Sequence, residues 1–194
     1  GIVLNYIGKF YLWTENNDKA IEYYKKSLII KEELNERSGM AHLYKHLGKL
    51  SEVKNNNQLA IEYYNNSLSL FQELGDKRDV AFIHGTIGDY YSDKESRIAI
   101  EHYKISHKLM IELEEWWRAS TYAHSIALTY ENLGDYDKAK TFYIKAIELN
   151  SGDKKQKHEL LGYSNLHLGY CYIEIGEYES ALEYFNQSLE NWDA

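Results

Sequence analysis

Small, branched and aromatic residues recur at helical spacing in five copies along the chain. A branched residue precedes a small one in each copy, and the small residues are separated by steps of 40, 40, 39 and 42 positions: Gly8, Gly48, Gly88, Ala127 and Gly169. Each copy continues with an alanine, then an aromatic residue four positions later: Ala20 and Tyr24, Ala60 and Tyr64, Ala99 and Tyr103, Ala139 and Tyr143, Ala181 and Phe185. Spacings of three and four place side chains on one helical face. Each copy therefore predicts two amphipathic helices.

Short polar segments separate these predicted helices, at residues 15–18, 55–57, 92–95, 134–135 and 176–177. Gly134 and Gly176 suit the left-handed conformation that ends a helix, and Asp135 suits the start of the next one. Residues 151–155 form the most polar stretch of the chain and contain the two extra residues of the 42-residue step. We expect a longer exposed loop there and no domain boundary, because the motif resumes in register at Gly169.

The repeated pattern resembles the tetratricopeptide repeat, whose signature is W-x2-L-G-x2-Y, then A-x3-F, then P. The resemblance extends from Val3 to about Leu189, and the period near 40 resembles the longer variety found in kinesin light chains, Pins-type adaptors and bacterial Rap regulators. The closing proline is absent throughout, and five residues replace the leading tryptophan: Leu4, Tyr44, His84, Ala123 and Asn165. The resemblance implies an all-α, right-handed α-solenoid of about five helix-turn-helix repeats with about ten antiparallel helices. We expect a single domain over 1–194, with repeats at about 1–40, 41–79, 80–118, 119–158 and 159–194.

Composition narrows the choice of function. The chain has 194 residues, no proline and 19 tyrosines, which argues against proline-rich linkers and loop-rich β-sandwiches. Its net charge of -8 repels a phosphate backbone, so we expect no nucleic-acid partner. No apolar run is long enough to cross a bilayer, which predicts no membrane partner. The single cysteine, Cys171, fits a reducing compartment, and we expect the protein in the cytoplasm.

Few residues suggest catalysis or metal binding. His42 and His46 are four apart on a predicted helix, but no glutamate follows His42, and the neighbouring Lys45 would repel a cation. We expect these histidines to face solvent or a groove, and we expect Cys171 to be a buried structural thiol. The sequence contains no phosphate-binding loop and no nucleophile motif. We therefore predict no enzymatic activity, no metal and no cofactor.

The Trp116-Trp117 pair lies at the turn between two predicted repeats. Aromatic residues commonly fill such junctions, which favours one ring packed under the following helix pair. An exposed aromatic anchor for a partner is the alternative.

The resemblance also indicates where a ligand would bind, because the first helix of each repeat forms the concave wall in this family. We call these positions the predicted ligand face: Asn5, Lys9, His42, Lys45, His46, Lys49, Phe82, Thr86, Asp89, His124, Ser125, Leu128, Glu131, Tyr163, His167 and Tyr170. The face is basic in the first two repeats, acidic at Asp89 and Glu131, and aromatic in the last repeat. One hypothesis is an extended peptide with an acidic group near the first repeats and an apolar side chain near Tyr163 and Tyr170. The alternative is the polar inner surface that any such solenoid would have.

The predicted function is a non-catalytic adaptor that binds a peptide or protein segment in a concave groove. The second reading is the sensory or regulatory part of a larger signalling protein, such as a peptide-responsive regulator or an enzyme whose catalytic domain lies elsewhere. Both ends lack a polar capping helix, so we expect the chain to be a fragment, with further repeats or an effector domain beside it. Otherwise the open ends could mediate self-association.

Overall fold

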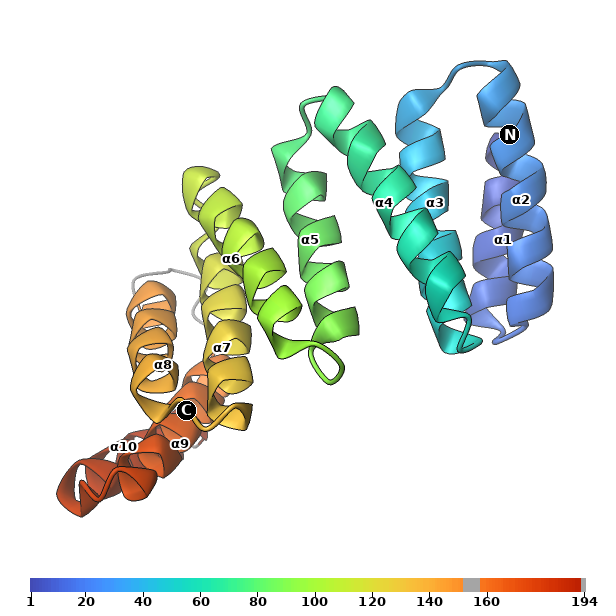
Figure 1. Cartoon of the computed structure of the whole chain (residues 1–194). Helices are drawn as coiled ribbons and strands as arrows, with labels where there is room; N and C mark the ends of the chain where they lie inside the picture. Colours follow the sequence, from blue (N-terminus) through green and yellow to red (C-terminus); the bar gives the residue numbers. More distant parts are fainter. Residues whose placement is uncertain (152–157, 193–194) are drawn as a thin grey trace. The chain divides into compact units, whose positions relative to one another are not determined.

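The computed structural model describes residues 1–151 and 158–192, and these residues contain ten α-helices (Figure 1). Their bounds are α1 Ile2–Trp13, α2 Asn17–Glu33, α3 Arg37–Val53, α4 Asn57–Glu73, α5 Lys77–Tyr91, α6 Ser96–Glu112, α7 Trp116–Asn132, α8 Tyr136–Ser151, α9 His158–Glu174 and α10 Tyr178–Trp192. Each predicted repeat therefore consists of one odd-numbered and one even-numbered helix. The long loop predicted at residues 151–155 lies, apart from Ser151 at the end of α8, outside the described residues.

The contacts divide the chain into two compact units, Gly1–Ile83 and His84–Ala194. The first unit contains α1 to α4 and the beginning of α5, and the second contains the remainder of α5 and α6 to α10. The prediction of one domain over 1–194 stays a prediction.

The two helices of a repeat meet where an aromatic ring lies across a glycine. A Cβ atom on Gly48 would lie 2.6 Å from Cδ1 of the Tyr64 ring, which is far inside van der Waals contact. The same contact occurs between Gly8 and Tyr24, Gly88 and Tyr103, and Gly169 and Phe185. Tyr24 and Tyr64 are fully buried by it. The pairing of small and aromatic residues that the sequence predicts is confirmed.

A hydrogen bond made by a serine also joins the two helices of a repeat. It lies closer to the beginning of the first helix than the contact between glycine and the aromatic ring does. In the first, second and fifth repeats, a second-helix hydroxyl donates to a first-helix carbonyl: Ser27 to Gly1 at 2.9 Å, Ser67 to Ala41 at 2.8 Å and Ser188 to Gly162 at 2.8 Å. In the fourth repeat the direction is reversed, because Ser120 on α7 donates to the carbonyl of Ala146 on α8 at 2.7 Å. Each such bond contributes on the order of 1 kcal/mol.

Most turns use one residue in the left-handed conformation to end a helix. Gly134 and Gly176 have φ values of 73° and 82°, as the sequence predicts. Gly75 adopts the same conformation, and so do four residues that carry side chains: Glu15, Asn35, Asn55 and Glu114. At the α3–α4 turn, the amide of Asn56 donates to the carbonyl of Ser51 at 2.8 Å, which closes a Schellman motif. Asp135 caps α8 as predicted, through its side-chain bond to the amide of Lys138.

Consecutive repeats are joined by apolar clusters within each unit. In the first unit, α2 contributes Ala20, Tyr24 and Leu28, and α3 contributes Leu43, Leu47 and Leu50. In the second unit, one such cluster contains Ala127, Ala139, Tyr143, Leu168 and Cys171. Cys171 is fully buried, as predicted for a structural thiol, and burial raises its pKa to about 12.

Replacing Gly48 with leucine should destabilise the protein, because the new side chain would occupy the space of the Tyr64 ring. We expect a loss of about 1–3 kcal/mol or more in unfolding free energy from this overpacking. Urea denaturation monitored by circular dichroism measures it. Gly75→Asn is the control, because no atom lies within 4 Å of a Cβ atom there and asparagine tolerates the positive φ. Equal stability of Gly48→Leu and the parent would contradict the proposed helix contact.

Candidate functional site

In the first unit, the two histidines of the predicted ligand face pack against aromatic rings of second helices. The His46 ring stacks on Tyr24 with centroids 5.3 Å apart, and His42 meets the Phe71 ring edge-on at 5.0 Å. Burial, with the nearby charges of Lys45 and Lys9, lowers the pKa of His46 to about 4. Burial lowers the pKa of His42 as well. Neutral imidazoles are therefore the dominant form at pH 7.

Two lysines of the predicted ligand face in this unit, Lys45 and Lys49, have acidic partners within the fold. Lys45 Nζ lies 3.3 Å from Asp79 Oδ1, and Lys49 Nζ lies 3.0 Å from Glu52 Oε1. The other oxygen of Glu52 accepts a hydrogen bond from the Tyr64 hydroxyl at 2.9 Å. The predicted basic stretch is thus partly neutralised by two acids that the sequence reasoning did not include in the site.

The remaining first-unit positions differ in exposure. Lys9 is exposed, with its ammonium 5.5 Å from the centre of the Tyr6 ring. The side-chain oxygen of Asn5 is buried and has no hydrogen-bond partner among the described residues. Phe82 is half-buried.

In the second unit, Glu131 is the centre of a hydrogen-bonded cluster between α7, α8 and α9. Its Oε2 accepts from the Tyr143 hydroxyl at 2.5 Å and lies 3.1 Å from Nδ1 of His167. A carboxylate only accepts, so Nδ1 of His167 carries the proton. Burial alone would raise the pKa of the Glu131 carboxyl, but the bonds from His167 and Tyr143 hold this pKa below its usual range.

Two imidazoles of the predicted ligand face flank the buried Tyr143 ring. His167 stacks on it at 5.7 Å, and His124 meets it edge-on at 5.3 Å. Nδ1 of His124 also lies 3.0 Å from the Ser164 hydroxyl. Burial lowers the pKa of His124 to about 4, and the neighbouring His167 adds to this effect. The structure therefore brings His124, Glu131 and His167 together, as one polar cluster.

The two tyrosines of the predicted ligand face, both on α9 in the fifth repeat, are more exposed than the polar cluster. Tyr163 and Tyr170 are 43% and 48% exposed. Tyr170 packs edge-on against Phe185, and Tyr163 packs edge-on against Trp192 at 4.9 Å. Their exposed faces can contact an apolar group of a ligand.

Four other predicted positions contribute less to the cluster. Asp89 accepts a hydrogen bond from the Tyr103 hydroxyl at 2.8 Å, so this acid, like Glu131, has a partner within the fold. The backbone carbonyl of Ser125 accepts from Thr129 at 2.7 Å. Thr86, Ser125 and Leu128 are half-buried.

The sequence reasoning missed Tyr143 and Ser164 as members of the polar cluster. A pairing signal was present, because an acid stands 12 residues before the ring in Glu52 and Tyr64, and again in Glu131 and Tyr143. In the fifth repeat the ring is Phe185, which has no hydroxyl, and the paired position is Ile173. The first and third repeats depart from this pairing, because Leu12 and Tyr91 stand 12 residues before Tyr24 and Tyr103.

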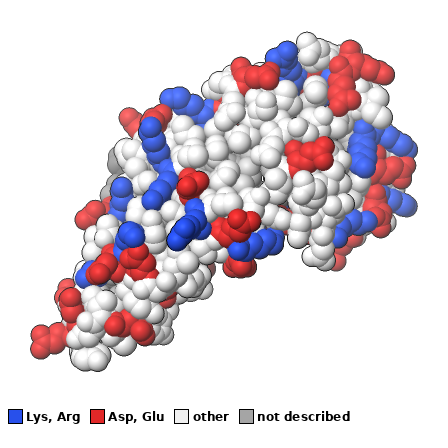
Figure 2. Space-filling model, in the orientation of Figure 1, with Lys and Arg blue, Asp and Glu red and all other residues white. Residues whose placement is uncertain are grey.

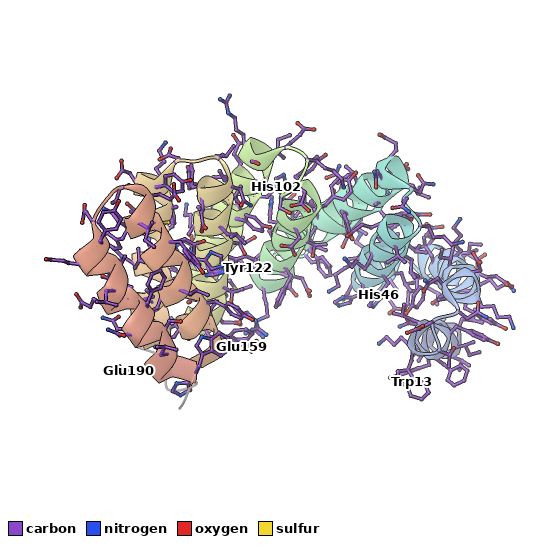
Figure 3. All side chains as sticks on the ribbon, turned by 90° about the horizontal axis from the view of Figure 1, so that it is seen from below. Trp13, His46, His102, Tyr122, Glu159 and Glu190 are labelled. Atoms are coloured by element: carbon purple, nitrogen blue, oxygen red, sulfur yellow. The ribbon has the colours of Figure 1, made fainter. Side chains whose placement is uncertain are left out.

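Another pair of histidines, His84 on α5 and His102 on α6, is in contact. Nδ1 of His84 lies 2.9 Å from Nδ1 of His102. Figure 3 labels His102 on its helix. Burial lowers the pKa of both rings, that of His84 to about 4. Within the described residues, no group of three or more His, Cys, Asp or Glu side chains is arranged to hold a metal ion.

Neither ring of the Trp116-Trp117 pair is fully buried. Trp116 is 38% exposed, and Trp117 is half-buried with the Arg118 guanidinium 4.6 Å from its ring centre. The expected packing under the next helix pair is therefore only partial.

Residues 117–194 match the family model described as tetratricopeptide repeat. None of the curated proteins matches the chain. This match and the solved structures described next confirm the resemblance that the sequence suggests.

Several solved structures share the fold over nearly the whole chain. BtubC (BKLC) from P. vanneervenii is 17% identical with a TM-score of 0.85, and the match covers 98% of this chain and 78% of that one. The apo form of RapI is 20% identical with a TM-score of 0.88, covering 98% of this chain and 53% of RapI. A putative kinesin light chain of Podosopora anserina with nearly identical TPR-like repeats is 13% identical, with a TM-score of 0.76 and coverages of 98% and 93%. The fold class, an all-α solenoid of about five repeats, is confirmed. The chain spans about half the length of RapI.

Among the helices formed by the described residues, none combines the length and the apolar composition needed to span a bilayer.

Lowering the pH should destabilise the protein through its buried histidines. The pKa values of His46 and His124 are about 4 in the folded state, against about 6.5 in an unfolded chain. Between pH 6.5 and 4 the unfolded state binds more protons, so stability falls as pH falls. At pH 5 the cost is about 1–2 kcal/mol for each histidine. Urea unfolding at several pH values measures this slope.

The variant His124→Asn should have a flatter pH dependence of unfolding free energy than the parent. The matched control is His158→Asn, which changes an exposed histidine at the start of α9 and should leave the slope unchanged. A slope that stays the same in both variants would show that His124 does not titrate as its burial requires.

Proposed function

We propose that this chain, a tetratricopeptide-repeat protein, is a non-catalytic scaffold that binds a peptide or protein segment through its first helices. Repeat proteins of this type commonly mediate protein–protein interactions. The observation that carries the proposal is the second-unit surface where His167, which is hydrogen-bonded to Glu131, contacts the exposed Tyr170 ring with centroids 6.3 Å apart. The exposed Tyr163 lies on the same helix, α9. This surface combines rigid hydrogen-bonding groups with exposed aromatic area.

The chemistry of this surface fits recognition better than catalysis. His124 is neutral at pH 7, Glu131 is held by two hydrogen bonds, and the thiol of Cys171 is buried with a raised pKa. None of these is an activated nucleophile, because activation requires a lowered thiol pKa or an adjacent base. Imidazole and tyrosine groups instead offer hydrogen bonds and ring contacts to peptide side chains. The ligand of the second unit is therefore a segment with an apolar or aromatic side chain.

The first unit offers a separate subsite with positive charge. Lys9 and Lys49 are exposed, whereas Lys45 and its partner Asp79 are partly buried, with side chains 28% and 19% exposed. Exposed ion pairs contribute little energy, so an incoming carboxylate can compete with Glu52 for Lys49. This subsite suits an acidic residue of the bound segment.

A second candidate is a sensory or regulatory segment of a larger signalling protein. The observation that favours it is the match to RapI, which covers 98% of this chain but only 53% of RapI. The coding sequence on either side of these residues tests this candidate. A catalytic or DNA-binding domain in the same reading frame would support it, and stop codons at both ends would contradict it.

Replacing Tyr163 and Tyr170 with alanine should weaken binding of a peptide selected from a displayed random library against the parent protein. We expect at least a tenfold loss of affinity, because buried aromatic anchors commonly contribute about 2 kcal/mol or more. Calorimetry at a protein concentration where the chain is monomeric measures it. Tyr178→Ala is the matched control, since this exposed tyrosine lies on the second helix of the same repeat. If Tyr178→Ala loses affinity and the double variant retains it, the first-helix surface is not the binding site.

Replacing Lys45 and Lys49 with uncharged residues should weaken the binding of acidic library peptides. The loss of affinity should be smaller at high salt, because salt screens the attraction between the charges. Methionine is the replacement, because glutamate at position 45 would also repel Asp79. We expect a loss of severalfold in affinity at low ionic strength. The control is Lys26→Met, which removes an exposed ammonium on α2. Unchanged affinity of acidic peptides for the double variant would eliminate the charged subsite.

A further inference from the structure

Helix α10, the second helix of the fifth repeat, exposes apolar residues at positions that are buried in α6, the second helix of the third repeat. Three positions of each second helix lie one, eight and eleven residues after the repeated alanine. Ile21 and Leu28 of the first repeat, Ile100 of the third and Ile147 of the fourth occupy such positions and belong to apolar clusters that include residues of the next repeat. In α6 these residues are Ile100, His107 and Met110, which are at most 6% exposed. In α10 the equivalent residues are Leu182, Leu189 and Trp192, and they are 62%, 62% and 46% exposed. In the first, third and fourth repeats, this side of the second helix packs against the first helix of the following repeat.

The first helix, α1, exposes the complementary surface. In α3, Leu43 and Leu50 pack against α2 and are 1% and 2% exposed. Their equivalents in α1 are Val3 and Phe10, which are 69% and 56% exposed. Tyr6 and Trp13 continue this apolar stripe along the same helical face, and Trp13 projects from the end of its helix in Figure 3. We call Val3, Tyr6, Phe10 and Trp13 the α1 face.

A groove between α9 and α10 is available to the α1 face. It has a volume of about 410 Å³ and is lined by Tyr170, Ile173, Phe185, Leu189 and Trp192. We call this groove, together with Leu182, the α10 face. A large exposed apolar surface of this kind marks an interaction site.

The charges of the two faces are complementary. Residues 1–14 contain Lys9 and no Asp or Glu. Residues 158–192 contain six glutamates and no Lys or Arg. Figure 2 shows acidic and uncharged atoms at the tip that α10 forms. Ion pairs already join neighbouring repeats within each unit, such as Lys54 with Asp18 and Lys140 with Glu177.

We propose that the α1 face of one copy packs on the α10 face of a second copy, so that two chains join head to tail as consecutive repeats do. The contact is heterologous, because each copy uses a different surface. It reproduces the apolar contact between α2 and α3, where leucines of one first helix cover the preceding second helix. Since a pair of copies keeps one free α1 face and one free α10 face after one contact, longer chains of copies form as concentration rises.

Sedimentation velocity over a wide range of protein concentrations tests this contact without any peptide. At moderate salt, which screens the net charge of -8, the average mass should rise above 22.8 kDa with concentration. Two variants should each be monomeric: Val3→Glu with Phe10→Glu, and Leu182→Glu with Leu189→Glu. All four side chains are exposed, so the variants should fold like the parent. The control Ile29→Glu with Leu133→Glu adds the same charge at equally exposed apolar sites and should associate like the parent.

Mixing the two monomeric variants is the decisive arm. One variant keeps an intact α10 face and the other an intact α1 face, so an equimolar mixture should form a dimer of twice 22.8 kDa and nothing larger. A parent that stays monomeric at every concentration would overturn the proposal. So would association that persists in either variant alone, which would indicate a symmetric contact, or a mixture that fails to dimerise. Because this measurement uses no peptide, its failure leaves the binding proposal untouched, and the loss of peptide binding leaves this one untouched.

Discussion

The close approach of a glycine on one helix to an aromatic ring on the next is the contact on which the structure depends. At Gly48 the ring of Tyr64 occupies the space where any side chain would begin, so the two helices of the repeat can cross only with glycine there. The ring is then buried, and it forms part of the surface against which the following repeat packs, as the Tyr24 ring does where His46 stacks on it. The contact within a repeat thus also determines the contact between repeats.

Burying tyrosine rather than phenylalanine requires a partner for the hydroxyl, and this requirement generates the polar cluster of the second unit. Glu131 accepts from Tyr143, and the same carboxylate then orients His167. The histidine returns to the Tyr143 ring by stacking on it. Burial of the Tyr143 hydroxyl in the core is thus accompanied by a hydrogen-bonded polar group that joins α7 and α9. In the first repeat, Leu12 stands at the acid's position, and the buried hydroxyl of Tyr24 has no partner among the described residues.

Much of the fold could be predicted from the sequence, because the contacts that determine it recur at a fixed period. The pair of a small residue and an aromatic ring, Gly48 and Tyr64 in the second repeat, recurs in the other four copies and identified both helices and their contact. Gly134 and Gly176 identified two turns. The candidate site was harder to predict. Its positions followed from the repeat register, but the acids appeared available for a ligand, whereas Glu131 and Asp89 accept hydrogen bonds from tyrosines within the fold. The pairing of Asp79 with Lys45 could not be predicted from the sequence, because the two residues are 34 positions apart and lie in different repeats.

The turns have a consequence for how such a chain changes its length. Glu15, Asn55 and Gly134 end first helices in the same left-handed conformation, and Asn35, Gly75 and Glu114 do so after second helices. The joint within a repeat and the joint between repeats are thus nearly alike, and both accept residues with side chains. A stretch of about forty residues bounded by two such joints has the same kind of joint at either end, whichever helix it begins with. Duplication or deletion of such a stretch would therefore leave the remaining joints unchanged.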